Sequence, residues 1–291
     1  MSTGVLLVAH GTPESLDQMP EYLTLVRGGR APSAHLVEEM RHNYTAIGGR
    51  SPLTDLTQAQ AAALRAALPG APVFVGMRNW RPFIADALRE AAAAGVTRVV
   101  VVPLAPQYSS LSVAKYRQAV EAALPPGMAM SFVSSWHDHP GLLEAFALRT
   151  RAALSAGPVD AVVFTAHSLP QRVIAEGDPY AEQVKATAAG VAARAGVGAF
   201  EQAWQSAGRT EEPWLRPSLE EALQALADAR RRRVLVVPVG FVCDHTEILF
   251  DIDQQAQAFA RERGMELRRT ESLNTEPTFI AALADVVRAA L

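Results

Sequence analysis

The chain of 291 residues contains one cysteine, Cys243, and no long apolar run. One cysteine excludes a disulfide framework and a cysteine-ligated iron–sulfur cluster within a single chain. No segment reaches the roughly 18 apolar residues that a membrane-spanning helix needs. The amino terminus also lacks the basic and apolar regions of a secretory signal peptide. We therefore expect a cytoplasmic protein without a transmembrane segment.

Strong charge and nucleotide-binding motifs are missing as well. The formal net charge is -3, which leaves no electrostatic footprint for nucleic acid. The chain has no Walker loop, no G-x-S-x-G elbow and no CxxC pair, and its two Gly-Gly pairs do not have the spacing of a dinucleotide-binding loop. Motifs therefore give no support for a nucleotide-dependent enzyme, a serine hydrolase or a thiol oxidoreductase.

Two short segments of the same design lie roughly half the chain apart. Val5–Pro13 and Val162–Pro170 each run through apolar residues to an Ala-His pair, followed by a small residue and a proline. A continuous apolar run is typical of a buried parallel strand, and open α/β sheets form their sites at the carboxyl ends of such strands. Each segment is thus expected to bring a histidine, His10 or His167, to a functional edge.

Strand-like runs alternate with helical stretches along the whole chain, which predicts an α/β fold with parallel sheets flanked by helices. Helical spacing is clearest from Pro82 to Gly95 and from Pro140 onward. The expected strands are 4–9, 72–77, 98–103, 130–135, 160–166, 199–204, 233–240 and 266–271.

A second repeat divides the chain into two related halves. The valine-rich run 99–104 resembles the run 234–239, and each follows its histidine segment in the same order. We therefore predict two Rossmann-like domains, residues 1–130 and 131–291, that share a cleft. The carboxyl-terminal helix, 276–291, is compatible with packing on either domain.

Acidic side chains follow the second valine-rich run. A helix beginning near Asp244 would be capped by that carboxylate, with Glu247 completing a capping box. Glu247 and Asp251 are spaced to share a helix face, although capping and solvation alone also account for Asp244 and Asp251. Glu247 is expected opposite His167, and an imidazole with a carboxylate suits Fe(II) and can also move protons. A hydrogen-bonded structural role is the alternative for His167.

The His137-Asp138-His139 segment is not expected to bind a metal. Its two imidazoles are separated by one residue, so a third ligand would have to come from elsewhere, and the segment directly precedes a helix-starting proline.

Several motifs together resemble the ferrochelatase family. They cover nearly the whole chain, and they are nearest to the soluble coproporphyrin ferrochelatases. In the first half they are Gly11–Pro13, Tyr44, Ile47–Gly49, Ser51-Pro52 and Pro106–Ser109. In the second half they are Ala166–Pro170, Gly177–Tyr180, Trp204–Ser206, Pro213-Trp214, Val239–Phe241, and Asp244 with His245 and Glu247.

The resemblance implies a chelatase-type fold, with the active-site cleft between two Rossmann-like domains, and insertion of Fe(II) into a porphyrin. It implies His167 and Glu247 as catalytic residues, without dividing their roles, and as metal ligands together with Asp251. Fe(II) is then a substrate, and no tightly bound cofactor is expected. The implied porphyrin-binding residues are His10, Arg27, Arg30, Tyr44, Ser51, Tyr108, Trp204 and Ser206.

The chain departs from the family pattern at three positions. His10 stands where the nearest branch often has tyrosine, which preserves a candidate axial ligand but changes its proton chemistry. Gln255 replaces an acidic residue one turn beyond Asp251, which weakens any outer metal site. Asn79 stands where other members have an aromatic residue or histidine.

The segment Glu14–Pro32 favours a particular porphyrin, because this expected lip of the cleft is polar and carries Arg27 and Arg30. Guanidinium groups match carboxylates, so we expect coproporphyrin III, which has four propionates, unless both arginines are merely solvated. Protoporphyrin IX is the alternative substrate; a cobalt or sirohydrochlorin chelatase and a non-catalytic haem-binding protein are the remaining alternatives. Transient contacts with the preceding and following haem-pathway enzymes are also expected.

Overall fold

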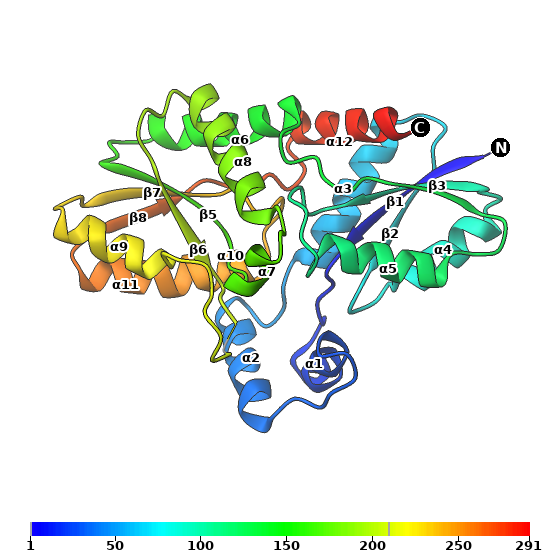
Figure 1. The fold of residues 1–291 in the computed structure, drawn as a ribbon, viewed down its shortest axis with the longest axis horizontal. Coiled ribbons are helices and arrows are strands. Elements are labelled where there is room, and N and C mark those ends of the chain that lie inside the picture. Colours follow the sequence, from blue (N-terminus) through cyan, green and yellow to red (C-terminus); the bar gives the residue numbers. More distant parts are fainter. Residues whose placement is uncertain (1, 209) are drawn as a thin grey trace.

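The computed structural model describes residues 2–208 and 210–291 and contains two parallel four-stranded sheets (Figure 1). The first sheet has the order β2-β1-β3-β4 and the second β6-β5-β7-β8, so the two halves repeat one topology. All eight expected strands are confirmed, with ends that differ by a few residues. The strands are β1 Thr3–Ala9, β2 Val73–Met77, β3 Arg98–Pro103, β4 Ala129–Phe132, β5 Ala161–His167, β6 Glu201–Gln205, β7 Arg233–Pro238 and β8 Glu266–Arg269.

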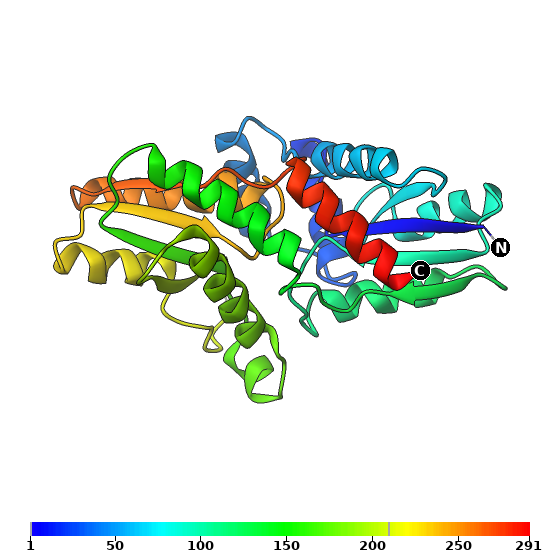
Figure 2. The ribbon, with the colours of Figure 1, turned by 90° about the horizontal axis from the view of Figure 1, so that it is seen from above.

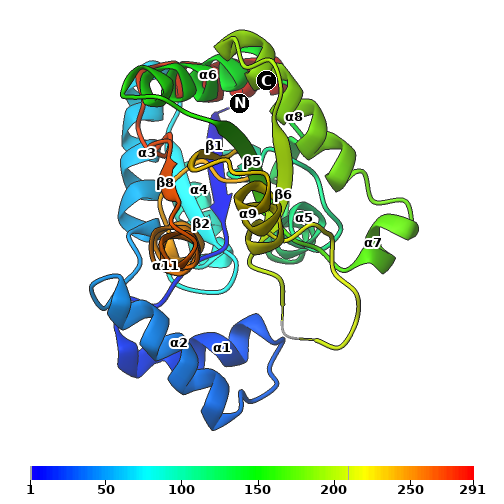
Figure 3. The same cartoon turned by 90° about the vertical axis from the view of Figure 1, so that its left-hand side faces the viewer.

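Helices cover both faces of each sheet, as the strand–helix alternation predicts. Helices α1 and α2 are the exception, because they pack together as a small lobe below the sheets (Figures 1 and 3). The α-helices are α1 Met19–Val26, α2 Ala34–Ala46, α3 Leu53–Ala67, α4 Ile84–Ala93, α5 Val113–Ala123, α6 Pro140–Ser155, α7 Gln171–Ala175, α8 Tyr180–Ala195, α9 Leu219–Asp228, α10 Thr246–Leu249, α11 Gln257–Glu262 and α12 Pro277–Ala290. A 3-10 turn spans Leu16–Gln18, and a π-helix spans Asp251–Ala256.

The two halves share one apolar core. Buried side chains of β1, such as Leu7, belong to the same cluster as Phe164 of β5 and Phe279 of α12. Helix α12 packs against both α6 of the second half and α3 of the first, and it crosses the junction between them (Figure 2). Burial of this common surface opposes separation of the halves, since apolar area leaves water.

Buried polar contacts also join the halves. Gln60 Nε2 donates to the carbonyls of Val242, at 3.3 Å, and Asn274, at 2.9 Å. Gln107 Nε2 donates at 3.1 Å to both Thr187 Oγ1 and the Val239 carbonyl. These amides are fully enclosed, and a buried donor is costly to leave unpaired. The relative orientation of the two sheets is therefore fixed by directional bonds as well as by apolar packing.

The loop after β7 lies unusually close to the end of β5 at Gly240. A Cβ at this position would lie 2.7 Å from the Ala166 Cβ and 2.9 Å from the Ala166 Cα. Gly240→Ala is therefore expected to lower the free energy of unfolding by about 1–3 kcal/mol through overpacking, as measured by urea denaturation. The matched control is Gly198→Ala, because a Cβ there meets nothing within 4 Å. Equal stability of the two variants would contradict the expected clash.

No helix in the described part of the chain is long and apolar enough to cross a membrane.

Candidate functional site

The candidate site begins at the pair predicted from the sequence. His167 is the last residue of β5, and Glu247 lies on the one-turn helix α10 that follows β7. The His167 Nε2 lies 3.7 Å from Glu247 Oε1, and the side chains are 33% and 36% exposed, so a ligand can reach both. The His167 Nδ1 lies 2.5 Å from the Ser168 carbonyl. A carbonyl can only accept, so this contact places the proton on Nδ1 and leaves the Nε2 lone pair toward Glu247.

A second histidine, His245, flanks the same carboxylate. Its Nε2 lies 3.8 Å from Glu247 Oε2, its Nδ1 donates to the Cys243 carbonyl at 3.0 Å, and its ring packs against Phe241. The sequence analysis quoted His245 within a motif but gave it no role. Two imidazoles therefore face one carboxylate from opposite oxygens.

These neighbours set the charge of the pair. Burial alone would raise the pKa of Glu247, but its electrostatic interaction with His167 and the hydrogen bond from His245 outweigh burial and lower that pKa to about 2. Burial would lower the pKa of His245, but the hydrogen bond and charge of Glu247 overcome this and raise it. Glu247 is consequently an anion throughout the neutral pH range, which suits a cation better than a proton.

Asp251 follows Glu247 by four residues and is the first residue of the π-helix. Its carboxylate accepts a hydrogen bond from the Ser206 hydroxyl, which lies just past the end of β6. Burial, followed by the negative charge of Glu247, raises the pKa of Asp251 to about 7. The structure thus couples Asp251 to Glu247 electrostatically and joins it to Ser206 by a hydrogen bond.

Asp244 does not cap a helix, and this expectation was wrong. Helix α10 begins at Thr246 with His245 as its N-cap, and no side chain makes the capping hydrogen bond. The Asp244 carboxylate instead accepts from Ser272 Oγ at 2.7 Å and Asn274 Nδ2 at 2.9 Å. The local spacing resembles a capping box, but distant partners on the segment after β8 hold this carboxylate more strongly.

His10 extends the site on the first half, directly after β1. Its Nε2 lies 3.0 Å from Asn79 Nδ2 and its Nδ1 3.1 Å from the Gly11 carbonyl. The Tyr22 hydroxyl, from α1, lies 3.3 Å from the same Nδ1. His10 is exposed at the surface. The surrounding protein nevertheless lowers the pKa of its imidazole by desolvation, and the hydrogen bond to Gly11 and the charge of Glu247 only partly offset this lowering. His10 is therefore a neutral imidazole at neutral pH.

Two of the family departures are thus in contact, because His10 and Asn79 hydrogen-bond to each other. The contact with Tyr22 was missed by the sequence analysis. No pattern could reveal it, since it depends on how α1 folds back beneath β1.

The remaining predicted binding residues differ in how accessible they are. Tyr108 is half-buried, and Arg27 and Arg30 are exposed at the end of α1. Tyr44, Ser51 and Trp204 are buried. The Tyr44 hydroxyl already bonds Thr12 Oγ1 at 2.7 Å, and Ser51 Oγ accepts from Leu53 N at 3.4 Å. Tyr44, Ser51 and Trp204 are thus enclosed by the fold, whereas Arg27 and Arg30 are accessible to solvent.

The His137–His139 segment has structural partners. The His137 Nδ1 lies 2.8 Å from Ser135 Oγ, and His139 caps α6 by accepting from Gly141 N. Among the described residues, no three histidine, cysteine or acidic side chains converge in a way that would hold a metal ion by themselves.

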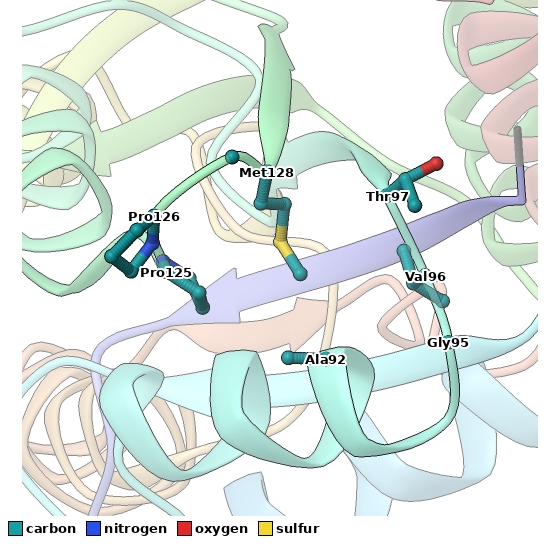
Figure 4. A pocket seen from close by; sticks show the side chains of 8 residues that line it. Ala92, Gly95, Val96, Thr97, Pro125, Pro126 and Met128 are labelled. Carbon is teal, nitrogen blue, oxygen red and sulfur yellow. The ribbon is translucent and has the colours of Figure 1, made fainter.

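Two surface hollows lie away from His167 and Glu247. One is lined by the loops that precede β3 and β4, including Val96 and Met128 (Figure 4). Another is lined by residues that precede β5 and β6, including Val159 and Val197. Both occupy the amino-terminal edges of the sheets, whereas His10 and His167 stand at the carboxyl ends of their strands.

The chain is similar to known proteins over nearly its whole length. Residues 2–291 match the model of the family described as Ferrochelatase. A ferrochelatase of Deinococcus radiodurans is 45% identical over 98% of this chain and 94% of its own. A coproporphyrin III ferrochelatase of Geobacillus kaustophilus is 37% identical over 98% of this chain and 95% of its own. The structure of SirB from Bacillus subtilis with Fe3+ covers 100% of this chain and 96% of its own with a TM-score of 0.64, but at 13% identity it shows the fold alone.

Proposed function

The chain belongs to the ferrochelatase family, and on this premise we propose that it inserts Fe(II) into coproporphyrin III to give coproheme in haem biosynthesis. It is a metal-insertion enzyme, a lyase that forms nitrogen–metal bonds. The choice of coproporphyrin over protoporphyrin IX is the new element of the proposal.

The observation that carries this choice is the pair of arginines at the end of α1. Arg27 and Arg30 are exposed, and within the described residues neither guanidinium has a carboxylate partner. The apolar side chains of α1, including Met19 and Leu23, are buried in the small lobe. The lip therefore offers guanidinium groups, which bind propionates well. The relative named coproporphyrin III ferrochelatase supports the same choice.

The proposed chemistry divides the work of the pair by charge. Insertion of Fe(II) into a free-base porphyrin releases two pyrrole protons. Glu247, which titrates near 2, holds the incoming cation and is a poor proton acceptor. The Nε2 of His167 has a free lone pair that faces Glu247, and it accepts the first pyrrole proton.

Asp251, which interacts electrostatically with Glu247, completes this chemistry. With a pKa raised to about 7, it is ionised in an appreciable fraction of molecules at neutral pH and can attract hydrated Fe(II) toward Glu247, or take the second proton. Fe(II) enters as a substrate, and we propose that no resident cofactor takes part. A cytoplasmic location remains a prediction from the sequence.

The porphyrin choice predicts a difference in Fe(II) insertion. In side-by-side anaerobic assays that follow loss of the free-porphyrin absorbance bands, kcat/KM is expected to be higher for coproporphyrin III than for protoporphyrin IX. Arg27→Ala and Arg30→Ala should each raise the KM for coproporphyrin up to about fivefold, since exposed ion pairs contribute at most about 1 kcal/mol.

The matched control is Arg89→Ala, because Arg89 is an exposed arginine whose one ion-pair partner among the described residues is Asp86 on α4. Its KM for coproporphyrin should match that of the unmodified enzyme. A higher kcat/KM for protoporphyrin IX would overturn the proposed substrate while leaving ferrochelatase activity intact.

A further inference from the structure

The two residues of the proposed pair are each held through their backbone by a buried side chain. The Tyr180 hydroxyl donates to the His167 carbonyl at 3.1 Å. Gln205 Nε2 donates to the Glu247 carbonyl at 2.9 Å. Tyr180 and Gln205 both lie in motifs that the sequence analysis quoted, but neither residue has been given a role.

Tyr180 is rigidly placed at the first turn of α8. Its ring is only 7% exposed and packs against Trp204, with 6.0 Å between the ring centroids. Its backbone N–H donates to Asp178 Oδ1 at 3.0 Å, and Asp178 Oδ2 accepts from Ser110 N at 2.6 Å. The hydroxyl that reaches His167 is thus anchored to both halves of the protein.

Gln205 is adjacent to His167 through its backbone and bonded to Glu247 through its side chain. It is paired with His167 in the β5–β6 register, and its own carbonyl accepts from Ser168 N at 2.7 Å. The side chain is 4% exposed, and among the described residues its Oε1 has no hydrogen-bond partner. A buried unpaired oxygen is costly. This cost indicates that the amide is retained for the bond that its Nε2 makes.

Glu247 needs such an anchor because of where it lies. Helix α10 has four residues and is followed by a π-helix. A single helical turn does not maintain itself, since nucleation fixes many dihedral angles for one hydrogen bond. Without an external donor, the Glu247 backbone could shift, and the 3.7 Å spacing to His167 would change with it.

We propose that Tyr180 and Gln205 are positioning residues that set the spacing and orientation of the His167–Glu247 pair. This inference rests on the roles proposed above for His167 and Glu247. Neither side chain needs to touch the porphyrin or the metal, because each acts through a backbone carbonyl. Outer partners of metal-site residues commonly influence activity about 10-fold to 100-fold when they are removed.

Steady-state kinetics of Tyr180→Phe and Gln205→Met test this proposal. Tyr180→Phe keeps the ring against Trp204, and Gln205→Met keeps the side-chain length, while each removes the donor. Each variant is expected to lower kcat for Fe(II) insertion about tenfold or more with the KM for porphyrin unchanged. Gln205→Met should also raise the KM for Fe(II).

The matched control is Gln202→Met. Gln202 lies on β6, the same strand as Gln205, and its Nε2 has no hydrogen-bond partner among the described residues. Removing the Gln202 amide should therefore leave kcat unchanged. If Gln205→Met is too unstable to assay, Gln205→Glu preserves the shape and places an acceptor against the Glu247 carbonyl. A loss in Gln205→Glu at least as large as that expected for Gln205→Met supports the proposal, whereas an unchanged rate overturns it.

A second readout does not depend on activity. Ring-nitrogen NMR signals of His167 in the apo protein, assigned with His167→Ala, should shift in Tyr180→Phe, while those of His139, the N-cap residue of α6, stay in place. Unchanged His167 signals together with unchanged kcat would overturn the positioning role. Retained insertion in His167→Ala and Glu247→Gln would instead overturn the proposed function of the pair, so the two failures are distinguishable.

Discussion

His167→Ala is expected to abolish Fe(II) insertion while porphyrin binding is retained. The substitution removes the Nε2 lone pair that faces Glu247, and with it the proposed acceptor of a pyrrole proton. Loss of a general base typically slows a reaction by about 10²–10⁴-fold. Absorbance assays measure the insertion rate, and quenching of protein fluorescence on titration with coproporphyrin III measures binding. The porphyrin Kd should change little, because all the predicted porphyrin-binding residues are unchanged in this variant.

His35→Ala is the control for this prediction. His35 is an exposed histidine on α2 that belongs neither to the proposed pair nor to the predicted binding residues. Its insertion rate should equal that of the unmodified enzyme. Full activity in His167→Ala, with thermal stability preserved, would remove His167 from the mechanism.

The sheet architecture was predictable because apolar runs report burial directly. Parallel strands covered by helices on both faces must be apolar throughout, and segments such as Val99–Pro103 and Val234–Pro238 meet this condition. The repeated order of histidine segment and valine-rich run also predicted two related halves. Strand ends were less certain, as in the run 130–135, where the strand ends at Phe132.

The pairing of His167 with Glu247 could be predicted for a related reason. Both follow central strands of one parallel sheet, β5 and β7, whose carboxyl ends must meet at the same edge. Asp244 shows the limit of local reasoning. Its spacing from Glu247 matches a capping box, yet its partners Ser272 and Asn274 lie about 30 residues away along the chain.

The departures at His10 and Asn79 gain a common explanation from the structure. From the sequence they are separate departures from the family pattern in distant segments. In the fold, Asn79 N also donates to the His10 carbonyl at 2.9 Å, and the side chains bond at 3.0 Å. The pair therefore keeps a polar, neutral group on the first half of the site, so the departures are consistent with the proposed chemistry.

Glu247→Gln is expected to lower kcat/KM for Fe(II) by roughly 10²-fold, since it removes the carboxylate charge that lies 3.7 Å from His167 while keeping the side-chain shape. The KM for porphyrin should be unchanged. An independent check comes from titrating the apo protein by NMR. The Glu247 charge raises the pKa values of both Asp251 and His245, so both should fall in the variant, that of Asp251 from about 7.

The control for this charge effect is Glu182→Gln, because Glu182 is an exposed carboxylate on α8 that, in the described part of the chain, pairs with Lys185 alone. It should alter neither the insertion rate nor the two titrations. If Glu247→Gln lowered both pKa values but left insertion unchanged, the electrostatic arrangement would be correct and Glu247 would have no part in metal transfer. If insertion fell while both titrations stayed in place, the carboxylate would act on the metal without setting the charge state of its neighbours. Only the combined loss is consistent with one anion that both holds Fe(II) and governs the protons around it.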